Sequence, residues 1–65
     1  MVEFRTAKMY DGKTVGIERT DGVFYKGFVK KVSKKDLTLE FQGMLQSYTL
    51  ESITKIRELK KNEQR

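Results

Sequence analysis

The sequence predicts an all-β protein, a small five-stranded barrel with strongly bent strands. Short segments in which apolar and polar residues alternate recur along the chain, and turn signals separate them. The clearest of these signals are Asp21-Gly22 and Gln42-Gly43. The longest alternating segment is interrupted by Gly27 and by two adjacent lysines, which is typical of a strand that bends rather than one in a flat sheet.

The first two strands are expected to form a hairpin. Val15 and Ile17 alternate with polar or small neighbours, and the run over residues 23–32 is rich in β-branched and aromatic side chains. Between the two segments, Asp21-Gly22 suits the two positive-φ positions of a type I′ turn.

The second strand contains an irregularity in its alternation. Tyr25 and Val29 share one face of the strand, but Val32 falls on the opposite face. A bulge at Lys30-Lys31 returns Val32 to the core and turns the two lysines outward. We therefore expect a bulge or sharp bend at these lysines, with Gly27 as a second place where the strand can curve.

Three further strands follow. The segment over residues 37–41 predicts a strand with Leu37, Leu39 and Phe41 inward, and residues 46–50 predict a short fourth strand. Residues 53–56 fit a 3₁₀ turn that enters a fifth strand.

Both ends of the chain leave alternatives open. The apolar spacing over residues 50–61 also fits a helix, but we prefer a short strand followed by a basic tail over residues 58–65 that can be helical. Residues 1–10 fit either a strand or a short helix, so the N-terminal helix is short or absent. The 65 residues form one domain, with the barrel core over about residues 13–57.

The composition excludes several classes of function. The chain has no Cys and no His, so it has no disulfide, no thiolate nucleophile, no imidazole base and no Cys/His zinc site. It has no Gly-rich phosphate loop, and turns account for Asp11 and Asp21. We expect no enzymatic activity, no cofactor and no bound metal. Because no apolar run approaches 18 residues, we expect a soluble cytoplasmic chain without membrane contact.

The charge of the chain favours a polyanionic partner. The net charge is +5 and the pI is about 9.6. Residues 23–36 carry five lysines and one acid, and residues 55–65 carry a second excess of bases. A lysine run is equally compatible with a solvated surface that protects a strand edge from aggregation.

The order of these residues resembles the Sm-like proteins, which include the bacterial RNA chaperone Hfq. Residues 15–29 resemble the first motif of the family, which is a strand, an Asp-Gly turn and a bent strand that contains the pattern Gly-x-hydrophobic. Residues 48–56 resemble its terminal strand pair, which contains the pattern Ile-x-x-Ile. The resemblance covers about residues 13–57 and implies an Sm-like or Src-homology-3-like barrel. A second resemblance, to YolD-like and other small barrel proteins of Gram-positive bacteria and their phages, implies a fold more than a role.

The chain departs from the Sm-like pattern at the uridine-reading loops. The loop after the second strand is Ser33-Lys34-Lys35-Asp36, which lacks both the Asp-x-x-x-Asn pattern of the Sm and archaeal branch and the Asp and aromatic residue of the Hfq branch. In the loop before the last strand, only Tyr48 matches the Hfq-like sequence. The resemblance therefore implies the fold but not the uridine pocket.

The sequence predicts a nucleic-acid-binding protein, with RNA or another single strand as its partner. Lysines neutralise phosphates, and aromatic side chains stack on bases, although each aromatic is also a candidate for the core. The candidate contact residues are Phe24, Tyr25, Lys26, Lys30, Lys31, Lys34, Lys35, Tyr48, Arg57, Lys60 and Lys61. The alternative is a protein-interaction or regulatory module of the phage or mobile-element type that acts through an exposed strand edge. Because Sm-like relatives assemble into rings, we favour a homo-oligomer, a ring or a dimer, over a monomer.

Overall fold

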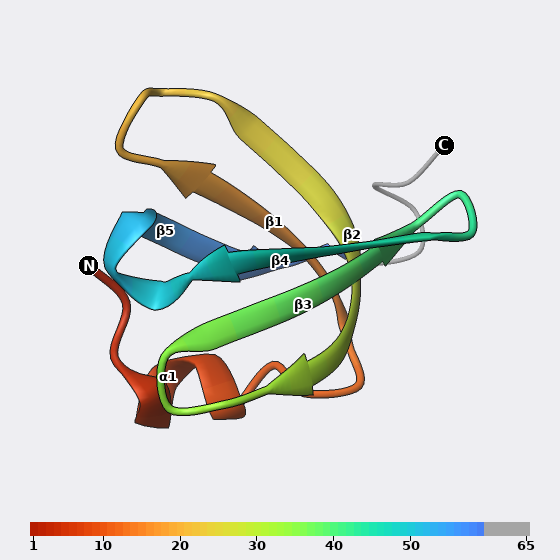
Figure 1. Ribbon diagram of the computed structural model, residues 1–65, viewed down its shortest axis with the longest axis horizontal. Coiled ribbons are helices and arrows are strands. Elements are labelled where there is room, and N and C mark those ends of the chain that lie inside the picture. The colour runs from red at the N-terminus through yellow and green to blue at the C-terminus, as the bar shows by residue number, and fades with distance from the viewer. Residues whose placement is uncertain (60–65) are drawn as a thin grey trace.

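The computed structural model describes residues 1–59, which form a short helix, a 3₁₀ turn and five strands (Figure 1). The elements are α1 (Phe4–Lys8), β1 (Thr14–Arg19), β2 (Phe24–Val32), β3 (Asp36–Phe41), β4 (Met44–Thr49), η1 (Leu50–Ser52) and β5 (Ile53–Glu58). The strands form one antiparallel sheet in the order β4-β3-β2-β1-β5. The predicted all-β class of a strongly bent, five-stranded barrel is confirmed, with β4 and β5 as the two edges of a sheet that does not close.

Strand β2 belongs to both halves of the barrel. Residues 24–28 pair with β1, and residues 28–32 pair with β3, so that the two ladders overlap at Phe28. The register with β3 shifts between Val29 and Lys31, which confirms the predicted irregularity. Val32 is buried, whereas Lys30 and Lys31 are exposed, as expected for a bulge that returns the apolar side chain to the core.

Gly27 lies in the bent part of β2, where the backbone of β3 comes close. A Cβ atom at this position would lie 2.8 Å from the carbonyl oxygen of Glu40, closer than side-chain carbons approach backbone atoms. The absence of a side chain therefore lets the two strands converge. The sharp curve of β2 is visible in Figure 1, where the yellow strand passes from the upper to the lower part of the molecule.

The core lies between the two halves of the bent sheet. Its largest fully buried side chains are Val15, Ile17, Val29, Leu37 and Ile53. Leu37 and Leu39 point inward as predicted, but the inward placement of Phe41 is wrong, since its side chain is 47% exposed. Phe41 pairs with Met44 beside the turn, where the hairpin extends past the core.

The N-terminal segment is a short helix, so the strand alternative for residues 1–10 is wrong. Helix α1 buries Ala7 in the core, and Val2 is also buried and donates its N–H to the carbonyl of Leu50 (3.3 Å). Met9, by contrast, is exposed. A single small residue, Ala7, therefore anchors this helix, so the apolar spacing left the strand and the helix equally open.

The C-terminal segment is a strand preceded by a 3₁₀ turn, so the helix alternative for residues 50–61 is wrong over its described part. The 3₁₀ turn was expected at residues 53–56, but it lies at Leu50–Ser52, and residues 53–56 already belong to β5. Glu58 ends β5, and the buried Leu59 donates its N–H to the carbonyl of Thr14 (2.8 Å). The first two residues of the predicted tail thus belong to the folded part. The rest of that tail lies outside the described residues.

The turn between β1 and β2 confirms the hairpin but not the predicted turn type. Gly22 has a positive φ of 83°, whereas Asp21 does not have a positive φ. The Gly22 N–H donates to the carbonyl of Arg19 (2.9 Å), and the Asp21 carboxylate accepts the N–H of Val23 (2.9 Å). The loop is thus one residue longer than a type I′ turn, because the Asp21 side chain stabilises a wider turn that ends on a left-handed glycine.

The turn between β3 and β4 has the type I′ geometry instead. Its two residues, Gln42 and Gly43, both have positive φ values, 53° and 80°, and connect the paired residues Phe41 and Met44. Glycine adopts this conformation without a steric penalty, but glutamine does not.

The left-handed backbone at Gln42 leads to a stability prediction. Substitution Gln42→Asn places the side chain that best tolerates this conformation at the first turn position, so the free energy of unfolding rises by about 0.5–1 kcal/mol. Urea denaturation followed by circular dichroism measures the change. The same substitution in the extended backbone of β4, Gln46→Asn, gives no gain, and equal stability of the unmodified and Gln42→Asn proteins would contradict the assignment.

Candidate nucleic-acid interface

A hollow of about 740 Å³ opens where the two halves of the barrel diverge. It exists because β2 pairs with β3 only from Phe28 onward, so the first half of β2 turns away from the β3–β4 hairpin. The lining residues on the β1 and β2 side are Arg19, Phe24, Tyr25 and Lys26, and those on the β3 and β4 side are Phe41, Met44, Gln46, Ser47 and Tyr48. Pockets of roughly 300–1,000 Å³ hold small ligands, so this hollow has the size for one nucleotide.

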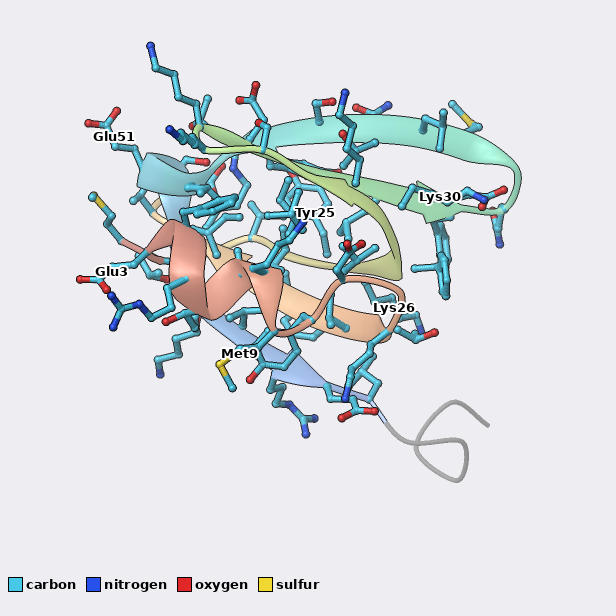
Figure 2. The ribbon with its side chains drawn as sticks, turned by 90° about the horizontal axis from the view of Figure 1, so that it is seen from below. Glu3, Met9, Tyr25, Lys26, Lys30 and Glu51 are labelled. Carbon is cyan, nitrogen blue, oxygen red and sulfur yellow. The ribbon has the colours of Figure 1, made fainter. Side chains whose placement is uncertain are left out.

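Two tyrosines from different strands meet in this hollow. The ring centroids of Tyr25 and Tyr48 lie 5.1 Å apart with their planes tilted by 39°. Both rings are half-buried and pack against the core, and Figure 2 shows Tyr25 within the molecule, between the strands. The core thus supports one side of the aromatic pair while the hollow leaves part of it accessible.

The pKa of Tyr48 is raised above its ordinary value. Burial is the largest cause, the neighbouring Tyr25 raises the pKa further, and the positive charge of Arg19 lowers it. The phenol is therefore protonated at neutral pH and offers an O–H donor beside a fixed cation.

Arg19 is held in place beside the tyrosine pair. Its guanidinium carbon lies 5.5 Å from the centroid of the Tyr48 ring, and its Nε–H donates to Ser52 Oγ (3.3 Å). The Ser52 hydroxyl in turn donates to the carbonyl of Thr49 (2.8 Å). The side chain that holds the arginine is thus itself fixed, and the terminal guanidinium nitrogens carry further donors suited to a phosphate.

Phe24 lies at the rim of the hollow, and its ring packs over Gly16 of β1. A Cβ atom at Gly16 would collide with the Phe24 ring, so the ring covers the backbone of β1 at that point. The side chain nevertheless remains 55% exposed. Its outer surface is therefore available for contact with a partner.

The lysines predicted to act together are divided between different parts of the structure. Lys26 lines the hollow, whereas Lys30 forms an ion pair with Glu40 (3.3 Å) and lies 5.7 Å from the Phe28 ring centroid. Lys31 is exposed at the bulge. In Figure 2, Lys26 and Lys30 lie toward the end that carries the β3–β4 turn.

The other predicted bases within residues 1–59 lie away from the hollow. Lys34 and Lys35 belong to the turn between β2 and β3, and they line a separate depression together with Glu3 and Glu51. Arg57 is on β5, opposite Gly16 of β1. Lys60 and Lys61 lie outside the described residues.

The structure therefore brings together Phe24, Tyr25, Lys26 and Tyr48 from the predicted set, and it adds Arg19, Phe41 and Met44. Sequence reasoning missed Arg19 because this residue belongs to a segment without net charge. Its position just before the Asp-Gly turn was the available signal, since a residue at the end of a strand lies at the open end of a barrel.

Other kinds of site find no support in the described part of the chain. Within residues 1–59, no three His, Cys, Asp or Glu side chains gather closely enough to hold a metal ion. In the same range, no helix is long and apolar enough to cross a membrane.

Comparison of the chain with protein-family models, with curated proteins and with solved structures finds no match in any of the three. The likeness to Sm-like proteins thus stays a prediction from sequence.

The environment of Tyr48 gives a second prediction. Substitution Arg19→Gln removes the positive charge that lowers the pKa of Tyr48, so this pKa rises further. An NMR pH titration of the tyrosine ring carbons measures the shift. Lys13→Gln is the control, because Lys13 is paired with Glu58 and not with Tyr48, and this variant leaves the pKa of Tyr48 unchanged. An unchanged Tyr48 pKa in the Arg19→Gln protein would contradict the contact.

Proposed function

We propose that this chain is a cytoplasmic binding protein for single-stranded nucleic acid, RNA in the first place, and not an enzyme. An unpaired base stacks in the hollow on Tyr48 and Tyr25, and Arg19 and Lys26 bind the adjacent phosphates. The observation that carries the proposal is that two tyrosine rings and the Arg19 guanidinium meet at one nucleotide-sized hollow, which Lys26 of β2 also lines.

The charges around the hollow support phosphate binding. Within residues 1–59, Arg19 and Lys26 form no ion pair with a carboxylate, whereas four other lysines do. These four are Lys8, Lys13, Lys30 and Lys55. A phosphate at the hollow therefore does not have to displace an existing carboxylate partner, and its counterions are released on binding.

The shape of the hollow supports a preference for single strands. The bases of a duplex are stacked on one another and cannot enter a recess between two half-barrels, whereas an unpaired base can. Stacking on an aromatic side chain contributes about 1–3 kcal/mol per base and tolerates any base. We therefore expect modest sequence preference and strong discrimination against duplexes.

A second candidate function is a protein-interaction module. It is favoured by β4, an edge strand whose residues are mostly exposed and which contains no charged side chain. Such an edge suits addition of a further strand through backbone hydrogen bonds. This function predicts no affinity for oligonucleotides.

A binding experiment separates the two functions. Fluorescence anisotropy is measured with labelled uridine-rich RNA, adenine-rich RNA and duplex DNA at low and moderate salt. Nucleic-acid binding predicts that both RNAs bind more tightly than the duplex and that affinity falls steeply as salt increases. Absence of binding to all three at low salt would remove the proposal and leave the protein-interaction module.

Substitution of the stacking residue tests the hollow itself. Tyr48→Leu keeps an apolar side chain against the core but removes the ring, so the affinity for RNA falls by about tenfold or more. Tyr10→Leu is the matched control, because Tyr10 also packs on the core but does not line the hollow. Equal affinities of the two variants would place RNA elsewhere on the surface.

Lys26 provides a test of phosphate contact. Lys26→Gln weakens RNA binding and reduces the dependence of the affinity on salt, since one counterion fewer is released. Lys55→Gln on β5 removes the same charge at a lysine that lies 4.0 Å from Glu18 and outside the hollow. If both variants lower the salt dependence of the affinity equally, RNA is attracted by the overall positive charge of the protein and not by a cation at the hollow.

A further inference from the structure

The β4 edge differs from the rest of the sheet in its charge. Within residues 1–59, the other four strands each contain charged side chains, whereas β4 reads Met-Leu-Gln-Ser-Tyr-Thr. Edge strands are usually protected from other chains by charges or proline, and β4 has neither. Its apolar side chains Met44 and Leu45 are 63% and 62% exposed.

The β3–β4 ladder determines which backbone groups of β4 face outward. In a two-residue hairpin the residues beside the turn exchange hydrogen bonds, and bonded and non-bonded pairs alternate from there. The Leu50 N–H, which donates to the carbonyl of Lys35 (2.8 Å), continues this alternation. The hydroxyl oxygens of Thr38 and Ser47 lie 3.0 Å apart, as expected for a close, non-bonded pair. The N–H and C=O groups of Leu45, Ser47 and Thr49 therefore point away from the sheet.

We propose that β4 pairs with β4 of a second copy of this chain, antiparallel and about a twofold axis at Ser47. This register uses all three outward-facing residues. Ser47 exchanges two hydrogen bonds with Ser47 of the second copy, and the Thr49 N–H donates to the opposite Leu45 carbonyl on each side. The Thr49 carbonyl accepts a hydrogen bond from the Ser52 hydroxyl (2.8 Å), and its second lone pair is available to the N–H of Leu45 in the second copy. The two open sheets thereby become one continuous sheet.

The absence of charge on β4 identifies a second copy as the occupant. The chain carries a net charge of +5, so two copies repel one another, and the neutral strand is where this repulsion is least. In this isologous contact Ser47 lies opposite its own counterpart, and every other residue of β4 lies opposite another residue of the same strand, so a charge near the axis would meet a like charge. A strand of six uncharged residues avoids this.

The other edge of the sheet is less suited to pairing. Strand β5 carries Lys55, Arg57 and Glu58. The N-terminal residues Met1 and Glu3 also line a depression together with Lys55 and Arg57, so the chain's own start lies beside this edge. A head-to-tail assembly through β4 and β5 would have to accommodate both features, whereas the twofold contact involves neither.

A pair of matched variants tests the interface. Multi-angle light scattering across a concentration series is expected to give the unmodified protein about twice the chain mass of 7.6 kDa. Ser47→Lys sets two ammonium groups opposite each other and weakens the dimer by at least about fivefold. Thr38→Lys is the control: it adds the same charge on β3, away from the edge, and removes the same hydroxyl contact with Ser47. This variant protein is therefore expected to remain dimeric. A monomeric unmodified protein, or equal dissociation of both variants, would overturn the proposal.

Disulfide trapping tests the register. Because the chain has no cysteine, Ser47→Cys introduces a single thiol, and directly opposed residues of a bonded pair have Cα atoms about 5.5 Å apart, within disulfide range. Mild oxidation is expected to give a cross-linked dimer with Ser47→Cys and none with Thr38→Cys. If Ser47→Cys stays uncross-linked, as head-to-tail pairing requires, the twofold contact is wrong. Neither test uses oligonucleotides, so the proposal stands or fails apart from the proposed function.

Discussion

The bend of β2 is the constraint on which the rest of the molecule depends. One nine-residue strand supplies partners to β1 with its first half and to β3 with its second half, and the register shift at Val29 and Lys31 separates the two. Gly27 permits the close approach of β3 that the bend requires. A straight strand would give a flat sheet with one face exposed, and so small a chain could not bury enough apolar surface in that form.

The same bend produces the two features that we connect with function. Because the halves diverge, a hollow remains between them, and Tyr25 and Tyr48 come from opposite sides of it. Because the curved sheet does not close, β4 keeps a free edge. The hollow combines aromatic rings with cations, as a nucleic-acid site does, and the edge is neutral, as an interface between like-charged copies should be. The two surfaces differ in chemistry, although residues of β4, among them Met44 and Ser47, belong to both.

Alternation and turn residues predicted the fold well, because burial on one face of a strand leaves a period of two in the sequence. They located the hairpin, the bulge and the inward Leu37 and Leu39. They could not place Phe41, since the pattern does not tell where the core ends along a hairpin. Of the site, the sequence singled out Tyr25 and Tyr48 by residue type, but their meeting depends on how sharply β2 curves. The sequence also grouped the lysines that the fold then separates.

NMR mapping of a short uridine oligonucleotide on the isotopically labelled protein shows whether the bend of β2 creates a binding site. If the bend creates the binding site, the largest shift changes occur at the rings of Tyr25 and Tyr48 and at the Arg19 side chain, on both sides of the hollow. Changes confined to Lys34 and Lys35, which lie outside the hollow, or no changes at low salt, would show that the bend does not create the binding site.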